Sequence, residues 1–198
     1  MFKLTSSTLV TAFFLASAMA SPFTLNTRTT SACAGFGPDA MDNVKGNFIM
    51  VADDGSTGRI NSLALDNSSI SSAIKVLGPM STHPNVRFAT SFELQDGTLV
   101  PVGASAGAVA RPVDAGSLVT FVNERSRPAP IYCAVPQHDD HNTVLLAVNG
   151  DTESFAVCPE EGKSTTKTNL VYQPQANGAG YIYGQCQRVN VRVVALSS

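Results

Sequence analysis

The apolar residues of this chain fall in short runs, and Gly, Pro, Asp and Asn separate one run from the next. Apolar runs of a few residues bounded by turn residues are typical of β-strands. In the last run Val189, Val191 and Val193 alternate with polar residues, so a strand there would bury one face. The pattern predicts strands over residues 47–52, 86–94, 98–102, 118–122, 131–135, 143–148, 154–157, 170–172 and 188–196.

Two pairs of these predicted strands are joined by dipeptides that favour tight turns. Asp96-Gly97 lies between the second and third runs, and Asn149-Gly150 follows the sixth. Both dipeptides tolerate the positive φ angles that two-residue hairpins need. The best helical candidate, residues 61–77, has serine and β-branched residues through its middle, which lower helix propensity. We therefore expect an all-β fold, an antiparallel β-sandwich first or a small closed barrel, with a β-trefoil-like barrel as the alternative.

Residues 1–20 have the pattern of a secretory signal peptide. Lys3 precedes an apolar run, and Ala18-Met19-Ala20 forms a small-x-small cleavage site. The run is too short to span the roughly 30 Å of a bilayer core. We expect the mature chain to begin at Ser21 and to be secreted, without a membrane partner.

Downstream of the signal peptide, residues 21–32 are rich in Ser and Thr and lack an apolar period. This composition predicts a flexible leader, followed by a single β domain over residues 33–198.

The charge balance limits the partners of the protein. The net charge is -2 and charged residues make up only 14% of the chain. A surface so near neutrality lacks the basic patch that nucleic acid or acidic lipid requires, so we expect no nucleic acid partner. The 43% apolar share excludes disorder driven by low hydrophobicity.

Four cysteines, Cys33, Cys133, Cys158 and Cys186, lie after the signal peptide. An even number of cysteines on a secretory route predicts two disulfides. No two are at CxxC spacing, which argues against zinc. Three pairings are open at this point, and each bridge would stabilise the fold by roughly 3 to 4 kcal/mol in the chain-entropy model.

Residues 103–107 match G-x-S-x-G, the pattern of a hydrolase nucleophile elbow, with Ser105 as nucleophile. Asp114 and either His138 or His141 follow in the order of a catalytic triad. The elbow requires a strand followed by a helix, and no helical pattern follows Ser105 because Arg111-Pro112 interrupts it. We therefore expect no enzymatic activity and keep the serine hydrolase as a third hypothesis.

His138, Asp139, Asp140 and His141 form the densest group of potential metal ligands. His83 is the one other histidine of the chain. Since His and Asp are common in turns, our interpretation is a solvated loop, with no cofactor and with the metal site as a weak candidate.

Two further features concern sugars, the first a binding patch and the second a site of glycan attachment. Tyr181 and Tyr183 are two residues apart, so on a single strand they would share a face and form a small sugar-binding patch, although packing against the core is the favoured interpretation. Asn67-Ser68-Ser69 is an N-x-[ST] sequon, which predicts N-glycosylation of Asn67 on the secretory route.

Four segments, CAGFGP, FIMVADDGST, LAVNGDTESFAVCP and YGQCQRVNVRVVAL, resemble small secreted proteins of filamentous fungi. These are the phialide-associated cell-wall proteins and their IgE-binding allergen relatives. The resemblance implies a non-enzymatic protein that is wall-associated or released, with Cys158 paired to Cys186 and Cys33 left with Cys133. The strand pattern agrees, since Cys158 ends one predicted strand and Cys186 precedes the last.

Three functional hypotheses follow. The first is a secreted, non-enzymatic surface protein of the fungal cell wall or extracellular space. The second is a secreted binding module or effector, whose partner is a glycan such as cell-wall polysaccharide or a host or extracellular protein. The third is the small serine hydrolase centred on Ser105.

Overall fold

The computed structural model describes residues 31–55, 57–68, 71, 73–83, 89–103, 108–123, 128–137, 143–162 and 167–196. Over these residues the chain forms strands and three short 3-10 helices, and the strands make two antiparallel sheets. The predicted all-β antiparallel fold is confirmed. The predicted signal peptide over residues 1–20 lies outside the described residues.

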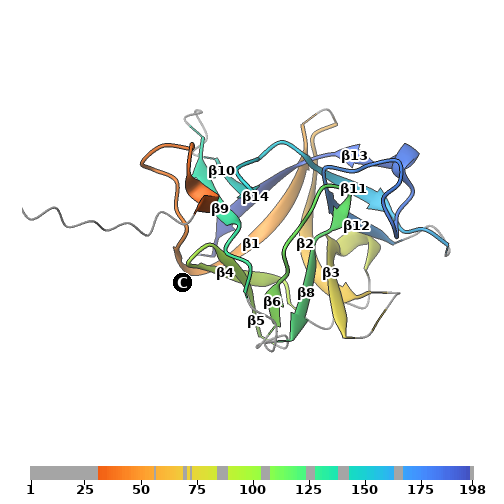
Figure 1. Cartoon of the computed structure of the whole chain (residues 1–198), viewed down its shortest axis with the longest axis horizontal. Helices are drawn as coiled ribbons and strands as arrows, with labels where there is room; N and C mark the ends of the chain where they lie inside the picture. Colours follow the sequence, from red (N-terminus) through yellow and green to blue (C-terminus); the bar gives the residue numbers. More distant parts are fainter. Residues whose placement is uncertain are drawn as a thin grey trace, which may run out of the picture.

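The first sheet has ten strands and the second has four. Figure 1 shows β11, β12 and β13 of the second sheet toward one end of the molecule and β9 and β10 toward the other. The first sheet contains β1 (Val44–Asp54), β2 (Arg59–Asn67), β3 (Ile74–Pro79), β4 (Ser91–Gln95), β5 (Thr98–Val102), β6 (Ala108–Ala110), β8 (Thr120–Asn123), β9 (Tyr132–Pro136), β10 (Val144–Val148) and β14 (Asn190–Ala195). The second contains β7 (Ser117–Leu118), β11 (Phe155–Pro159), β12 (Thr168–Tyr172) and β13 (Gln187–Arg188), and the 3-10 helices are η1 (Ser31–Cys33), η2 (Met80–Thr82) and η3 (Tyr183–Gln185).

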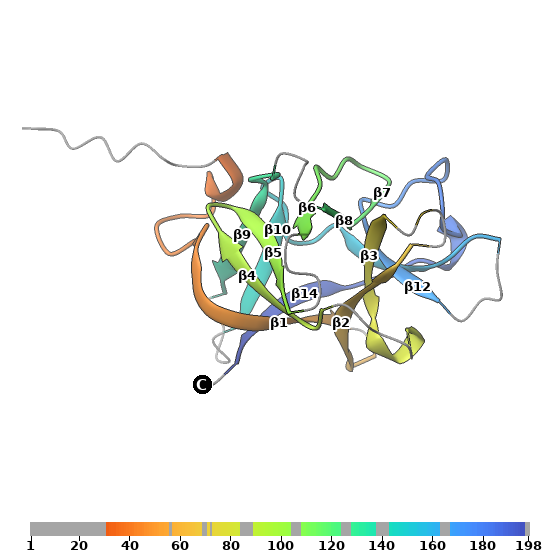
Figure 2. The same cartoon turned by 90° about the horizontal axis from the view of Figure 1, so that it is seen from below.

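The long strand β1 curls the first sheet into a half-barrel. Along one edge β1 pairs with β14, while along the other edge its first half pairs with β4 and its second half with β2. The register with β4 shifts between Val44 and Phe48, and Gly46 lies between them at φ 82°. A bulge of this kind bends a strand and increases its twist, and the bend in β1 is visible in Figure 2.

The main hydrophobic core is shared by both sheets. Phe92 of β4 lies between Phe48 of β1 and Phe121 of β8, with ring centroids 6.5 and 6.0 Å apart. Phe155 and Leu170 from the second sheet belong to the same buried cluster. Each of these five side chains is fully buried, so the second sheet covers the open side of the half-barrel.

The two predicted turns form, but only one of them makes a hairpin. At the first, Asp96 and Gly97 have φ 47° and 73° and connect β4 to β5 in register. At the second, Asn149 and Gly150 also have positive φ, yet β10 pairs with β9 and β14 while β11 pairs with β12 and β13. The expected hairpin between residues 143–148 and 154–157 is therefore wrong, because the chain leaves the first sheet after this turn.

Two predicted strands are each divided between the sheets. Residues 118–122 become the end of β7, then Val119, then β8, and residues 188–196 become the end of β13, then Val189, then β14. Both valines are buried, and the backbone N–H of Val119 donates to Leu170 while that of Val189 donates to Phe155. Strands that switch sheets in this way form the corners of a β-structure. The helical candidate at residues 61–77 is occupied by strands β2 and β3.

Both disulfides form with the favoured pairing. Cys33 of η1 is bonded to Cys133 of β9, and Cys158 of β11 is bonded to Cys186, with Cα atoms 5.3 and 4.1 Å apart. Ala32, expected in the flexible leader, is instead buried in the small cluster around Cys133. Within the described part of the chain, none of the helices is long and apolar enough to cross a membrane.

Candidate functional site

An open hollow of about 590 Å³ lies on the second sheet beside the Cys158–Cys186 disulfide. Its walls come from β13, from η3 and the residue after it, from β11 and the residue before it, and from the segment after β12. The polar and aromatic side chains of its lining are Ser154, Gln173, Gln175, Tyr183 and Arg188. A hollow of this size with a few convergent polar groups is typical of a small-ligand site.

The two tyrosines predicted as a sugar patch have different roles. Tyr181 is 3% exposed and forms an isolated bridge to Glu160, whereas Tyr183 begins η3 and is 49% exposed. The expectation that they share one strand face is wrong, because η3 begins at Tyr183, one residue after Ile182, so the two tyrosines are not on one strand. In the described part of the chain, Tyr183 is the one aromatic side chain among the exposed large apolar residues.

Tyr181 fixes the loop around Gln175, which lines the hollow. Its hydroxyl accepts the backbone N–H of Gln175 at 2.8 Å and donates to the carbonyl of Gln175 at 3.0 Å. Gly178 lies against this hydroxyl so closely that any side chain there would collide with it. The buried tyrosine thereby places Gln175, while the disulfide places Cys186 at the end of η3.

A polar network fixes Gln173 at the edge of the hollow. Its side-chain amide donates to Asp151 at 3.2 Å and to the Tyr172 hydroxyl at 3.0 Å. Burial raises the pKa of Asp151, but hydrogen bonds from Ser154, the Glu153 backbone, Gln173 and Tyr172 outweigh it and leave the pKa lowered. Burial, with the nearby charge of Asp151, raises the pKa of Tyr172 to about 12. The carboxylate is therefore ionised at neutral pH and orients the amide.

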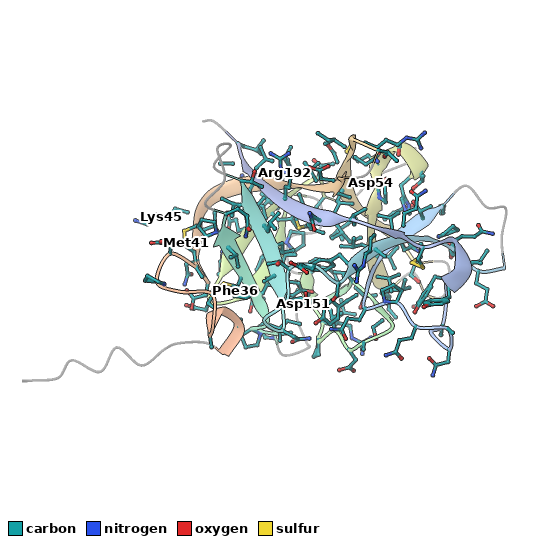
Figure 3. The ribbon with its side chains drawn as sticks, turned by 90° about the horizontal axis from the view of Figure 1, so that it is seen from above. Phe36, Met41, Lys45, Asp54, Asp151 and Arg192 are labelled. Carbon is teal, nitrogen blue, oxygen red and sulfur yellow. A yellow bond between two sulfur atoms is a disulfide. The ribbon has the colours of Figure 1, made fainter. Side chains whose placement is uncertain are left out.

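A groove between the sheets adjoins the hollow at Arg188, which lines both. It has a volume of about 490 Å³ and is acidic, with Asp53, Asp54 and Glu153 in its lining. Asp53 forms an ion pair with Arg192 at 3.3 Å. Asp54 and Arg192, from β1 and β14, are labelled in Figure 3. Arg188 thus separates an acidic groove from a hollow of different character.

A buried charged cluster also joins the two sheets. His83, 1% exposed, lies with Nδ1 2.9 Å from Asp66 Oδ2 and with Nε2 2.8 Å from the carbonyl oxygen of Thr168. Lys167 Nζ also donates to Asp66 Oδ2 at 2.8 Å. Gly78 packs against the His83 ring and the Thr168 carbonyl, where a Cβ would collide with both. Asp66 belongs to the first sheet and Thr168 to the second, so the cluster links the two.

The charge of Asp66 follows from its hydrogen bonds. Burial raises the pKa of Asp66, but hydrogen bonds from Lys167 and His83 outweigh it and leave the pKa lowered, so the group is a carboxylate. Both ring nitrogens of His83 face buried oxygen atoms, Nδ1 the Asp66 carboxylate and Nε2 the Thr168 carbonyl. Because neither nitrogen is available to activate a nucleophile, the pair is a structural link between sheets. Sequence reasoning missed it because Asp66 and Lys167 are 101 residues apart.

Of the other predicted site residues, Asn67 and Asp114 belong to the part of the chain that the structure describes. Asn67 is exposed at the end of β2, where its side-chain oxygen accepts a hydrogen bond from Lys75. Asp114 is exposed. Over the described residues no group of three or more His, Cys, Asp or Glu side chains could hold a metal ion. Outside the described residues lie the hydrolase candidate Ser105 and the metal candidates His138, Asp139, Asp140 and His141.

Comparison with known proteins adds no relative. No family model matches the chain, and neither a curated protein nor a solved structure matches it. The described part is a disulfide-bonded, all-β protein with an open hollow and an adjoining groove. Its function has to be argued from that geometry.

Proposed function

We propose that this protein is a secreted, non-enzymatic surface protein that associates with the cell wall by binding polysaccharide in the Tyr183 hollow. The single observation that carries this proposal is the exposed ring of Tyr183 beside the amides of Gln173 and Gln175. A flat aromatic ring stacks on the apolar face of a sugar, and amides pair with its hydroxyl groups.

The rigidity of the hollow supports this proposal. The disulfide holds Cys186 beside η3, and the Tyr181 hydroxyl holds Gln175. A site already in its bound shape loses less conformational entropy when a flexible chain binds. Four cysteines paired in two disulfides are also typical of proteins on the secretory route.

The lining of the hollow favours binding over cleavage. Glycoside hydrolysis uses two carboxyl groups placed across the sugar, one as acid and one as base or nucleophile. None of the described residues that line the hollow is Asp or Glu. A saccharide bound there would meet stacking and hydrogen-bonding groups without an acid to protonate its leaving oxygen.

Retention on insoluble polysaccharide tests the proposal. The purified mature protein is incubated with particulate cell-wall polysaccharide of several compositions, and the bound fraction is measured against concentration. Tyr183→Ala should weaken retention about tenfold, the effect of losing one stacking contact. Leu196→Ala is the matched control, because Leu196 is 48% exposed, close to the 49% of Tyr183, and is not among the described residues that line the hollow. Equal retention of the two variants, or none by the natural protein, would refute the proposal.

Fractionation of the producing culture tests localisation separately. We expect the protein in the soluble and covalent wall pools as well as in the medium. Recovery solely from inside the cells would contradict a secreted wall-associated role.

A further inference from the structure

Among the described residues, a single charged side chain lines the hollow around Tyr183. Of the described residues in its lining, only Arg188 is ionised at neutral pH, and the others are polar, aromatic or small. The protein as a whole has a net charge of -2, so its surface does not attract anions in general. Any preference of this hollow for an anion therefore has to come from Arg188.

Arg188 differs from its basic neighbours in having no partner within the described structure. Lys167 pairs with Asp66, and Arg192 pairs with Asp53. The side chain of Arg188 is exposed on β13, and no hydrogen bond or ion pair of its guanidinium is found among the described residues. A guanidinium offers five donors in a planar fork that matches a carboxylate.

The two regions that adjoin Arg188 differ in charge. On one side lies the groove with Asp53, Asp54 and Glu153, which repels an anion. On the other side lies the hollow with Tyr183, where none of the described lining residues is acidic. A ligand whose anionic group binds Arg188 is thus directed toward Tyr183. The sugar ring that carries this anionic group can then stack on the tyrosine ring.

We infer that the hollow selects a polysaccharide that carries carboxylate groups, a uronic-acid chain, with Arg188 binding the carboxylate while Tyr183 stacks on the sugar ring. This inference rests on the proposed polysaccharide-binding function and names its ligand class. The Arg188 side chain is the specificity-determining group, and Gln173 and Gln175 bind the hydroxyl groups common to all sugars.

Calorimetric titration with a matched pair of ligands tests this inference. The probes are a galacturonic acid hexamer and its fully methyl-esterified form, which has the same sugar chain without the charge. We expect the acid to bind the natural protein about tenfold more tightly than the ester, as a charge-assisted bidentate contact should give. In Arg188→Gln the two probes should bind equally. Lys45→Gln is the charge control, because Lys45 is exposed at the far end of the molecule in Figure 3.

The outcomes distinguish this inference from the proposed function. If the ester binds the natural protein as tightly as the acid, polysaccharide binding stands and the preference for uronic acid is refuted. If neither probe nor any particulate polysaccharide binds, both proposals fail. If Lys45→Gln lowers the affinity for the acid as much as Arg188→Gln does, the attraction is a net-charge effect and the role of Arg188 is refuted. Raising the salt concentration should weaken acid binding by the natural protein and leave ester binding unchanged.

Discussion

Replacing His83 by leucine tests whether the buried cluster with Asp66 holds the two sheets together. Leucine occupies a similar volume but makes neither of the two hydrogen-bond contacts of the His83 ring nitrogens. The Thr168 carbonyl then loses its contact with the side chain. Asp66 keeps the Lys167 ammonium and the backbone N–H of Asn67, so its charge stays partly compensated.

The expected loss of stability follows from these contacts. A hydrogen bond to a charged group contributes about 1.5–3 kcal/mol, and a buried acceptor left without a donor costs about 1–3 kcal/mol. The apolar surface that leucine buries offsets part of this loss. We expect His83→Leu to lower the free energy of unfolding by about 3 kcal/mol, as the loss of both buried contacts should give.

Urea unfolding at neutral pH, with both disulfides intact, measures this change. Lys167→Met removes the half-exposed partner of the same carboxylate and serves as a second variant if His83→Leu does not fold. We expect a smaller loss from Lys167→Met, about 1 kcal/mol, because water solvates that ammonium. A loss below about 0.5 kcal/mol for His83→Leu, the range of ordinary surface substitutions, would refute the structural role of the cluster.

The remaining predictions concern Asp66 and the disulfides. The lowered pKa of Asp66 means that its contribution to stability is present above its unfolded-state pKa of about 3.9 and is lost as the pH falls through the folded-state value. Asp66→Asn should therefore lower stability at pH 7 and make its decline in acid shallower, as urea unfolding across pH measures; parallel pH profiles would contradict this. In the chain-entropy model, removing the 28-residue link of Cys158 and Cys186 by a double Ser replacement costs about 3.6 kcal/mol, and removing the 100-residue link of Cys33 and Cys133 costs about 4.7 kcal/mol. Both double variants, if folded at low temperature, should be assayed for polysaccharide retention. Only the variant without the Cys158–Cys186 disulfide should lose retention; equal retention by the two variants would show that the hollow does not depend on this disulfide.

Local sequence was enough to predict most strands of this protein. The strand over residues 98–102 has the bounds of β5, and the Asp96-Gly97 turn before it forms as expected. These features depend on φ preferences and on alternation within a few residues, which neighbouring residues determine. The strand pattern also favoured the Cys158–Cys186 pair, because these cysteines lie at the ends of two predicted strands, whereas Cys33–Cys133 followed only as the pair left over.

Tertiary structure alone decided which sheet each strand joins. Val119 and Val189 look like ordinary members of apolar runs, yet the chain changes sheets at both. The reason is packing at a distance: the backbone of Val119 bonds to Leu77 on one side and to Leu170 on the other. No local pattern encodes partners so far away in the chain.

The candidate site, like the fold, was predicted only in part from the sequence. Sequence spacing singled out Tyr181 and Tyr183, but only the fold buried the first and exposed the second, because a 3-10 helix begins where a continuous strand was expected. Arg188 showed no distinguishing pattern in the sequence. Its position between an acidic groove and the Tyr183 hollow arises from segments that meet only when both sheets pack together. Charge and stacking at a site depend on such neighbours in space, and residue order along the chain does not determine them.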